Sequence, residues 1–534
     1  MNTPRSFIQS TMKFSLTFIL LFPMLYACTS PPPSQEPDIT KTALDRAEAI
    51  VASIALPKIP STRIDLVKFS GKAPDEEGTH DFREDIEKAI AALAAQGGGT
   101  LFFPHTRGKN AWVKQVETYR VKGPIHLKSN IQLAFDPNLR LYFEFDPASY
   151  MLPGGTLRRY EGTTMFSFSP LIYAFNEKNI AIVQEKGAGV PAKIDGDGMR
   201  WQRWAVEQDG KRRSQGLKPS YEAIRDVNHR DTPLKNRIFT DVNTDVFRPQ
   251  LISFFMCENI LMDGVQVENS PFWMVHPVFS KNMVFRNLIF DGPVVNNDGF
   301  DPESSSHVLI ENIIFNNHDD NVAIKAGRDK EGRDGVQVAG TLLQDIDNEY
   351  IKDGRLGGPT THVVVRNCTF RGHHAVAIGS EMSGGAHTVF IYDNVGPQQV
   401  KNALYLKSSR KRGGTIQDIY MFNNRLNYVE SVVALLPNYD GDKESPFIPT
   451  FKNVWVVNTQ VNTSNHGIRI KGWPGKPIAG VTLTHVSIDS VRKEEHLSIQ
   501  NVKDLTLDRV VIEGKAYDQV INQVDSTALP EKSM

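Results

Sequence analysis

Cysteine is scarce in this sequence, with only Cys28, Cys257 and Cys368 among 534 residues. A disulfide framework is therefore not expected. The sequence also contains no CxxC, HExxH or Walker-type glycine loop, so we expect no metal, nucleotide or redox cofactor. Cys257 and Cys368 lie far apart in the sequence, each beside an apolar run, and are predicted to be buried free thiols.

Neither sign of charge is in excess. Lys and Arg total 60 and Asp and Glu total 61, which gives a formal net charge of -1. This balance offers no bulk attraction to nucleic acid, and we expect no nucleic-acid partner. A hydrophobic content of 40% is ordinary for a globular chain. No feature indicates an oligomer, so we expect a monomer.

The apolar run at residues 14–27 is too short for a comfortable membrane span. Lys13 precedes the run, and Ala27 ends it, which is typical of a signal peptide over residues 1–27. Because Cys28 follows directly, the segment resembles a bacterial lipobox, which implies lipidation of Cys28; a plain signal peptide with a chance cysteine is the alternative.

The lipobox interpretation sets the expected location of the protein. Residues 28–60 would form a lipidated tether and a helical lead-in, the tether being the proline-rich stretch at residues 30–34. We therefore expect an exported lipoprotein that is anchored to the outer membrane through Cys28. The sequence leaves open whether it faces the periplasm or the cell surface.

Short alternating runs recur from about residue 250, and each ends in a polar or glycine turn. The first five turns fall at Gly264, Asn287, Asn312, Asn367 and Asn394, at similar intervals except for the long one between Asn312 and Asn367. Looser copies continue as far as DLTLDR, which ends at residue 509. An interval of about 25 residues suits one coil of a parallel β-solenoid, in which stacking buries the apolar faces. The absence of helical patterns between the runs argues against a TIM barrel.

Two segments interrupt or end this repeat. Residues 327–358 are polar and glycine-rich, so the long interval is interpreted as one coil plus an insertion. Residues 82–96 have apolar side chains at helical spacing and would form a helix that caps the open end of the stack. We expect one β-helix domain over residues 61–525, followed by a tail at 526–534.

A candidate catalytic group lies within the repeat. Asp298 and Asp301 share one tight turn, and Asp319-Asp320 follow one repeat later. Carboxylates that return to one place on a stacked scaffold can share protons and activate water. Alone, Asp319-Asp320 would suit a solvated turn or a calcium site, but their separation from Asp298 by about one repeat favours catalysis. Asp301, between Gly299 and Pro302, is interpreted as a turn former.

Four motifs in order give the sequence a specific resemblance. They are Asn296-Asn297-Asp298, Asp319-Asp320, Gly372-His373, and Tyr405-Leu406-Lys407. On these motifs the sequence resembles glycoside hydrolase family 28, the polygalacturonase family, over roughly residues 61–515. The resemblance implies an all-β fold, a right-handed parallel β-helix.

The resemblance also implies roles for these residues. Asp319 would be the general acid, and Asp298 and Asp320 would hold and deprotonate the attacking water, with inversion at the anomeric carbon. Three carboxylates in one cleft should force one of them to stay protonated near neutral pH. A histidine beside the acid would tune its proton. Counting from the repeat turns selects His374, whereas the Gly-His placement favours His373.

The basic residues near the fourth motif point to an anionic substrate. Lys407 would bind a substrate carboxylate, but Tyr405 stands where the family usually has arginine and cannot bind a carboxylate through a two-pronged guanidinium. Arg410 and Arg412 could contact substrate or simply belong to a solvated loop. The predicted substrate-binding residues are Asn296, Lys325, Tyr405, Lys407, Arg410 and Arg412, within a basic neighbourhood that also includes Arg328 and Arg371.

The predicted function is an inverting hydrolase of galacturonosyl linkages in pectic chains. The insertion at residues 327–358 could close one end of the cleft and make attack exo-acting. Rhamnogalacturonan and substituted side chains remain alternative pectic substrates. A polysaccharide lyase on the same scaffold would need calcium and leave an unsaturated product, and a carbohydrate-binding solenoid would show no turnover.

Overall fold

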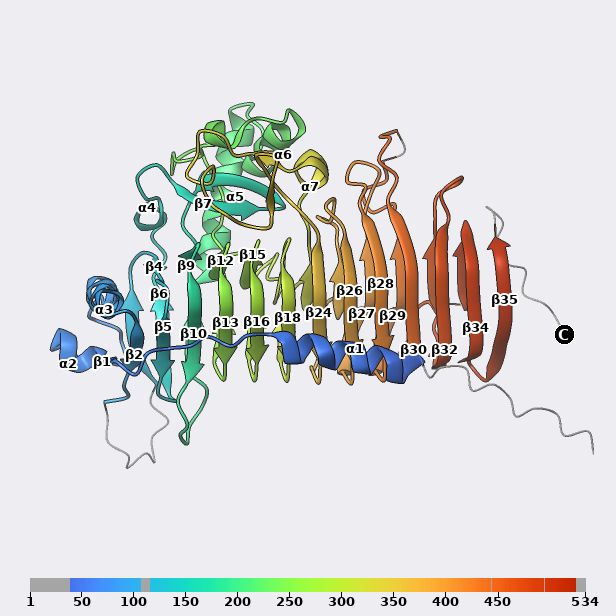
Figure 1. Ribbon diagram of the computed structural model, residues 1–534, viewed down its shortest axis with the longest axis horizontal. Helices are drawn as coiled ribbons and strands as arrows, with labels where there is room; N and C mark the ends of the chain where they lie inside the picture. Colours follow the sequence, from blue (N-terminus) through green and yellow to red (C-terminus); the bar gives the residue numbers. More distant parts are fainter. Residues whose placement is uncertain (1–38, 107–115, 443, 494, 525–534) are drawn as a thin grey trace, which may run out of the picture.

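The computed structural model describes residues 39–106, 116–442, 444–493 and 495–524. The chain forms the right-handed parallel β-helix that the sequence predicts, a long stack of coils that runs from the N-terminal to the C-terminal end (Figure 1). The predicted signal peptide, Cys28 and the tail at 526–534 lie outside the described residues. Among the helices that the structure describes, none is both long enough and apolar enough to cross a bilayer.

The first face of the stack is one continuous ladder of strands, parallel except for its last pair. It contains the predicted repeat runs, and their register confirms the stacking: Val308 of one run pairs with Val363 of the next. This direct pairing confirms that residues 327–358 are an insertion within one coil. The strands of this face, in order, are β1 Arg63–Asp65, β2 Gly99–Phe103, β5 Ile131–Phe135, β10 Lys178–Gln184, β13 Glu258–Asp263, β16 Lys281–Arg286, β18 Ser306–Glu311, β24 Thr360–Arg366, β26 Ala386–Tyr392, β28 Thr415–Phe422, β30 Thr450–Ser464, β32 Ile478–Val491, β34 Val502–Ile512 and β35 Lys515–Val524.

The second face carries the cavity described below. Its strands pair in parallel, and Phe300 bridges β15 to β20 so that the ladder continues past the turn that holds Asp298. Its strands are β4 Ile125–His126, β9 Ile172–Phe175, β12 Ile252–Phe255, β15 Val275–Val278, β20 Val322–Ile324, β25 Val376–Ile378, β27 Val395–Lys407, β29 Arg425–Leu436, β31 Ile468–Lys471 and β33 Leu497–Gln500.

The third face closes each coil. Its first strands form a separate parallel ladder, and Thr369 bridges that ladder to the start of β27. Leu, Ile, Val and Phe side chains from all three faces fill the interior of the stack, which is the main core. The strands are β3 Glu117–Val121, β6 Leu139–Phe143, β11 Lys193–Asp195, β14 Gln266–Glu268, β17 Ile289–Gly292 and β19 Ile314–Asn317.

Asparagine recurs at the turns because the backbone there is left-handed. Asn287, Asn312 and Asn367 have φ of 56°, 55° and 54°. Asparagine tolerates this conformation better than most residues. Cys257 and Cys368 are buried and free, as predicted.

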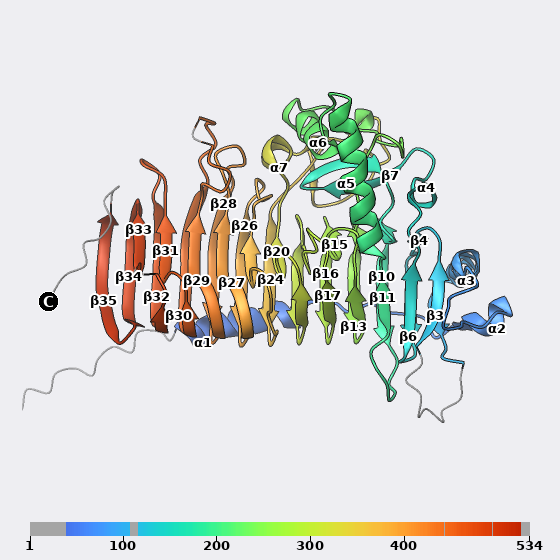
Figure 2. The same ribbon diagram turned by 180° about the vertical axis from the view of Figure 1, so that it is seen from behind.

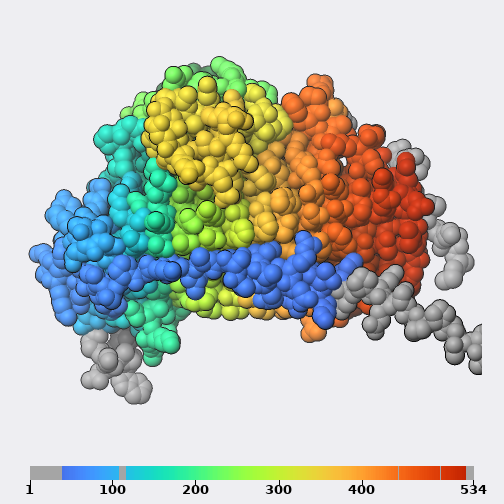
Figure 3. Space-filling view, in the orientation of Figure 1, coloured from blue at the N-terminus to red at the C-terminus, as the bar shows by residue number. Residues whose placement is uncertain are grey.

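Two helices cover open surfaces of the stack. The predicted capping helix is α3 (Arg83–Ala95), whose Ile86, Ile90 and Leu93 pack into the core at the N-terminal end. The short helix α2 (Leu66–Ser70) lies beside it. The lead-in helix is α1 (Ile39–Ser53), which runs as a belt across the first face (Figure 3).

The belt helix covers an aromatic stripe. Ala43, Ala47 and Ile50 pack in one cluster with Phe390 and Tyr420. The rings of Phe390 and Tyr420 stack with their centroids 4.9 Å apart, and the helix side chain Arg46 donates a 2.6 Å hydrogen bond to the Tyr420 hydroxyl. Helix α1 therefore ties several coils together from outside.

A group of excursions rises above the second face (Figures 1 and 2). Helices α5 and α6 were not predicted: α5 has only a weak apolar pattern, and the apolar spacing of the ten-residue α6 was not recognised. The excursions comprise α4 Pro147–Tyr150, the hairpin of β7 Thr156–Tyr160 and β8 Thr163–Ser167, α5 Gly198–Ser214, α6 Ser220–His229, the 3-10 turn η1 Leu234–Asn236, and the insertion with α7 Asp329–Asp334, β21 Val336–Gln337, β22 Ile351–Lys352 and β23 Arg355–Leu356. We call the β7–β8 hairpin, α6 and the insertion the wall.

The insertion leaves and rejoins its coil at one point. A Cβ atom on Gly384 would lie 2.7 Å from the carbonyl oxygen of Gly358 and 2.8 Å from that of Ala326. Both ends of the insertion thus pass the same glycine. Only a residue without a side chain fits between them.

Candidate active site

A cavity of about 520 Å³ opens on the second face between the wall and the loops that follow β27 and β29. The stack supplies its floor, and the wall supplies Glu161, Arg225, His229 and Arg328. The residues that line it are Glu161, Arg225, Asp226, His229, Phe272, Trp273, Asn296, Asp298, Asp319, Asp320, Lys325, Arg328, Asp329, Ser380, Glu381, Lys407, Lys411, Arg412, Tyr439 and Asp440.

The Asp298 turn is held by its neighbouring amide. Asn297 is buried, and its Nδ2 donates to the carbonyl oxygens of Ser270 and Phe272, 2.8 Å each. Asn296 has a φ of 62° and accepts a 2.8 Å bond from Arg248 through Oδ1. The turn therefore presents Asp298 to the cavity in a fixed position.

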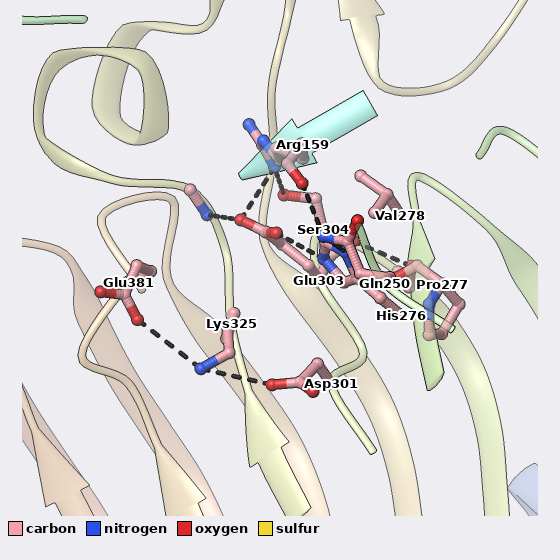
Figure 4. Close-up of polar contacts among 12 residues, drawn as sticks. Arg159, Gln250, His276, Pro277, Val278, Asp301, Glu303, Ser304, Lys325 and Glu381 are labelled. Carbon is pink, nitrogen blue, oxygen red and sulfur yellow. Dashed lines mark hydrogen bonds and ion pairs between the residues drawn. The ribbon is translucent and has the colours of Figure 1, made fainter. Parts of the chain in front are cut away.

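Lys325 gathers three carboxyl groups at the cavity floor. Its Nζ lies 3.2 Å from Asp298, 3.3 Å from Asp301 and 3.6 Å from Glu381, and Figure 4 shows it between Asp301 and Glu381. Burial raises the pKa of Asp298 to about 7 against the opposing effect of Lys325. Burial and then Asp298 raise the pKa of Asp301 well above its usual range. One proton therefore stays on this group near neutral pH.

Asp301 was interpreted as a turn former, and it does not line the cavity, but its carboxyl also contacts Lys325. Its carboxyl is fully buried, and beyond the Lys325 ammonium neither oxygen has a hydrogen-bond partner among the described residues. Phe300 points into the core, so the next residue must point outward onto the second face, where the wall covers it. The sequence could not show that cover.

Asp319 and Asp320 both contact His373, the histidine that the Gly-His motif favours. His373 Nδ1 lies 3.3 Å from Asp319 Oδ1 and 3.1 Å from Asp320 Oδ1. Lys407 Nζ donates a 2.7 Å bond to the other oxygen of Asp320. Burial alone would raise the pKa of Asp320, but Lys407 and the His373 bond outweigh it and hold the pKa well below its usual range. Asp320 is therefore ionised in the working pH range.

The two histidines have different surroundings. Lys401 Nζ lies 2.5 Å from His373 Nε2, so this nitrogen accepts and Nδ1 carries the proton that faces the two aspartates. His374 is buried, and its Nδ1 accepts from the backbone and the side-chain amide of Asn402. Burial lowers the pKa of His374 to about 3, which keeps its ring neutral.

Two predicted substrate-binding residues do not line the cavity. The Tyr405 ring packs against His374, with their centroids 4.6 Å apart, and its pKa is raised chiefly by burial. Arg410 donates a 2.5 Å bond to the Ser445 carbonyl. Asn296, Lys325, Lys407 and Arg412 do line the cavity.

A buried ionic network supports the wall from below (Figure 4). Glu303 binds His276 Nε2 at 2.8 Å and lies 3.3 Å from Arg159 of the hairpin. Arg159 in turn donates a 3.1 Å bond to Glu331 of the insertion. Burial would raise the pKa of Glu303, but Arg159 and His276 lower it. The network joins the hairpin and the insertion to the coil that holds Asp301.

One cluster has the composition of a metal site. Asp320, His373 and His374 place one ligand atom each within 4.8 Å of one another. However, the ammonium groups of Lys407 and Lys401 already bind Asp320 and His373, and His374 Nδ1 accepts from Asn402. These donors and cations do not fit a bound metal ion.

Sequence reasoning missed Glu161, Arg225 and Glu381. Glu161 and Arg225 lie well before Asp298 in the sequence, in segments without a repeat pattern. Glu381 lies in the IGSEMSGG stretch after the third motif, but nothing about a single glutamate marks it as buried. The wall brings Glu161 and Arg225 to the cavity, and the turn after β25 brings Glu381 there.

Comparison with known proteins agrees with this geometry. Residues 153–448 match the glycosyl hydrolases family 28. The chain belongs to this family. An exopolygalacturonase from Thermotoga maritima has a structure similar to this one, with a TM-score of 0.75 and 30% identity, covering 91% of this chain and 100% of that one.

Curated relatives give the same family. A probable polygalacturonase of Vitis vinifera is 24% identical over 438 residues, which cover 80% of this chain and 74% of the relative. A polygalacturonase of Ralstonia nicotianae is 27% identical over 234 residues, which cover 43% of this chain and 35% of the relative. This family 28 protein is therefore a glycoside hydrolase.

Proposed function

We propose that this family 28 hydrolase cleaves galacturonosyl linkages of pectic chains from one end, with inversion. The observation that carries the proposal is the meeting of Asp298, Asp319 and Asp320 in one cavity beneath the wall. The Thermotoga maritima relative, an exopolygalacturonase, supports both the substrate class and the exo action. The wall supports exo action physically, because it covers the stack beside the aspartates.

The proposed steps follow from the family resemblance and from the contacts of each aspartate. Asp319 is the general acid: its protonated carboxyl gives its proton to the leaving oxygen, and His373 Nδ1, 3.3 Å away, then holds the carboxylate that remains. Asp320 is ionised and accepts the proton of the attacking water. Asp298, which lies 3.2 Å from Lys325 Nζ, holds this water in place. Lys407 pairs with Asp320 and lines the floor where a substrate carboxylate would lie.

The test is product analysis on a panel of pectic polysaccharides and oligosaccharides, with Asp319→Asn alongside. We expect saturated monosaccharide from the wild type and a large loss of rate, about 10²-fold or more, in the variant. Proton NMR of the first product should show the inverted anomer. Mixed oligomers would contradict exo action, and an unsaturated product absorbing in the ultraviolet would indicate a lyase.

The choice among pectic linkages is part of the same test. Homogalacturonan is proposed as the substrate because polygalacturonases recur among the relatives. Release of rhamnose-containing or xylose-substituted products alone would instead assign a rhamnogalacturonan or a substituted side chain. We also propose that the protein is a monomer, which light scattering after size exclusion would test.

We further propose that Cys28 is lipidated and anchors the enzyme to a membrane. The apolar run followed by Ala27-Cys28 supports this proposal. Expression with a labelled fatty acid should label the wild type and leave Cys28→Ala unlabelled and released from membranes. Equal labelling of both would refute the anchor.

A further inference from the structure

Lys401, a residue of β27, contacts the histidine that lies beside the catalytic aspartates. Its Nζ lies 2.5 Å from His373 Nε2, and its backbone N–H donates a 2.9 Å bond to the His373 carbonyl oxygen. Val376 pairs with Leu404, so three residues earlier on both segments His373 lies opposite Lys401. The stacking of the coils therefore fixes this contact.

Lys401 acts through the ring of His373 and not on the substrate. Its side chain is exposed, and it is not among the residues that line the cavity. The other ring nitrogen, His373 Nδ1, lies 3.3 Å from Asp319 Oδ1 and 3.1 Å from Asp320 Oδ1. The ring therefore connects the Lys401 ammonium to the proposed general acid.

Only one proton fits between Lys401 Nζ and His373 Nε2. An amine holds a proton more firmly than an imidazole, by about four pKa units in model compounds. The proton therefore stays on Nζ, which donates it to Nε2 in the hydrogen bond. The ring cannot take a second proton unless this bond breaks, so His373 stays neutral with its proton on Nδ1.

A neutral ring matters because a cation beside Asp319 would oppose its role as an acid. An imidazolium 3.3 Å from the carboxyl would favour the ionised form. An ionised Asp319 has no proton to give to the leaving oxygen. Asp320 is held ionised and contacts the same nitrogen, so by itself it would draw a second proton onto the ring. The Lys401 ammonium opposes this effect.

Lys401 supplies the described contact of Nε2, and other groups near the ring lie elsewhere. The His374 ring, with its centroid 4.4 Å from that of His373, is kept neutral by burial. Lys407 binds the other oxygen of Asp320. The elements around the ring also carry three titratable side chains without a described contact to it, which are His318, Arg371 and Glu430.

We propose that Lys401 is a positioning residue that holds His373 neutral and so keeps the proton on Asp319 until the leaving oxygen takes it. This inference rests on the proposed function, in which Asp319 is the general acid. Lys401 touches no reacting atom. Its effect is to set the upper end of the pH range over which the enzyme works.

The test measures kcat/KM on galacturonan against pH for the wild type, Lys401→Met and Lys401→Arg. In Lys401→Met the alkaline limb should move to lower pH by about one unit, with little change in KM. Lys401→Arg should restore the wild-type limb, because a guanidinium also donates N–H bonds and stays charged. A role in packing alone would lower kcat at every pH and leave the limb in place.

Lys493→Met is the matched control. Lys493 is also exposed, and its Nζ lies 3.3 Å from Nε2 of another histidine, His466, on a later coil outside the cavity. Glu430, the β29 residue opposite Lys401, contacts this second pair. Loss of Lys493 should change neither kcat nor the alkaline limb.

Nuclear magnetic resonance of the ring nitrogens observes the proton directly in protein with isotopically labelled histidine. His373→Ala identifies the signals of His373 by their loss. At about pH 6 the wild type should have Nδ1 protonated and Nε2 bare, whereas both nitrogens should be protonated in Lys401→Met.

Two outcomes would overturn the inference. One is an unmoved alkaline limb in Lys401→Met, and the other is a His373 ring that carries two protons in the wild type. Failure of the proposed function would look different, because Asp319→Asn would keep its activity or the wild type would not hydrolyse galacturonan. The ring-nitrogen spectra would then still report whether Lys401 holds His373 neutral.

Discussion

At the scale of single residues, Asp298 ties the chemistry of the cavity to the stability of the fold. Its carboxyl is 4% exposed and shares Lys325 with two other carboxyl groups. A buried carboxyl that is protonated in the folded state and ionised in the unfolded chain lowers stability as pH rises. Asp298, which the proposed reaction needs, therefore lowers the stability of the folded protein at higher pH.

Asp298→Asn should make the protein less sensitive to rising pH. The pKa is about 7 in the folded protein and 3.8 in the reference state, a shift that corresponds to about 4 kcal/mol. This contribution of the protonated Asp298 to the free energy of unfolding is fully present below about pH 4 and is lost as pH rises to about 7. The pKa of Asp301 is also raised, so the pH dependence of stability should become weaker in the variant but should not disappear.

The measurement is Tm at about pH 4 and about pH 8 for the wild type, for Asp298→Asn and for the control Asp263→Asn. The wild type and the control should lose more Tm than Asp298→Asn between the two values. An equal loss in all three proteins would show that Asp298 is ionised throughout.

Measurements of kcat and of thermal stability should distinguish the roles of the two adjacent histidines. His373→Ala should lower kcat by about 10² or more with little change in Tm, because the side chain is partly exposed and contacts both aspartates. His374→Ala should cost about 1–3 kcal/mol of stability, because Asn402 would lose its acceptor. The opposite pattern would assign the catalytic position to His374.

Single-residue roles were only partly predictable from the sequence. Asp298, Asp319 and Asp320 stand out because the repeat returns them to one place. His373 could be chosen over His374 only by motif, and the contact with Asp320 is what separates their surroundings. Tyr405 and Arg410 were expected at the cavity because they flank Lys407. Tyr405 does share the outward face of β27 with Lys407, but its ring packs against His374, and Arg410 instead binds the Ser445 carbonyl.

At the scale of elements, the wall depends on one buried glutamate. Glu331 accepts from Arg159 at 3.1 Å, from the backbone of Thr164 at 3.0 Å and from Arg237. Its own backbone N–H donates to Asn228 of α6 at 3.0 Å. This residue of the insertion therefore holds the hairpin and α6 together.

Glu331→Gln should loosen the wall and change the products. Removing the charge leaves the buried Arg237 without its anion and leaves Arg159 with Glu303 alone, at a cost of about 3–5 kcal/mol. We expect a lower Tm and, if the wall sets exo action, longer oligosaccharides beside the monosaccharide in chromatography. Glu349→Gln, an exposed position in the same insertion, is the control. A lower Tm with unchanged products would mean that the wall does not set the product length.

The elements of the wall were the least predictable part of the chain. The sequence indicated an insertion, and Arg328 and Asp329 within it do reach the cavity. Helix α5 and the β7–β8 hairpin show no clear pattern of their own, and the amphipathic spacing of the ten-residue α6 was not recognised; all three are stabilised by contacts with distant segments. Asn228 of α6, for example, is satisfied by Thr163 and Arg328.

At the scale of the whole molecule, the last strand of the stack runs in the opposite direction to the strand beside it. Strand β35 pairs antiparallel with β34, whereas β34 and β32 are parallel. Most side chains of β35 are exposed, and half of its residues are both exposed and polar. Such an edge resists pairing with another molecule, which a bare coil would invite.

Deletion of residues 515–534 should make the protein associate. It would leave β34 as an open edge, so light scattering should show a mass that grows with protein concentration. Deletion of residues 525–534 alone keeps β35 and should leave the mass unchanged. A shorter protein that stays monomeric would show that β34 needs no cover.

The fold was predictable over most of its length because its signal is repeated. The recognisable runs gave the register of the first face from β13 onward. The earlier coils belong to the same ladder but were not recognised, since β1, β2, β5 and β10 are separated by irregular intervals. The α3 cap was predictable from its own apolar spacing, whereas the path of α1 across the aromatic stripe required the assembled stack.

The narrow neck of the insertion has a consequence for how such enzymes diversify. Because both ends of the insertion pass Gly384, its length is free to change without shifting the coil on either side. Descendants can therefore gain, lose or exchange this segment while inheriting the aspartates unchanged. On the proposed function, the reaction and the choice of where along a polymer to perform it would be encoded by separable pieces of one gene.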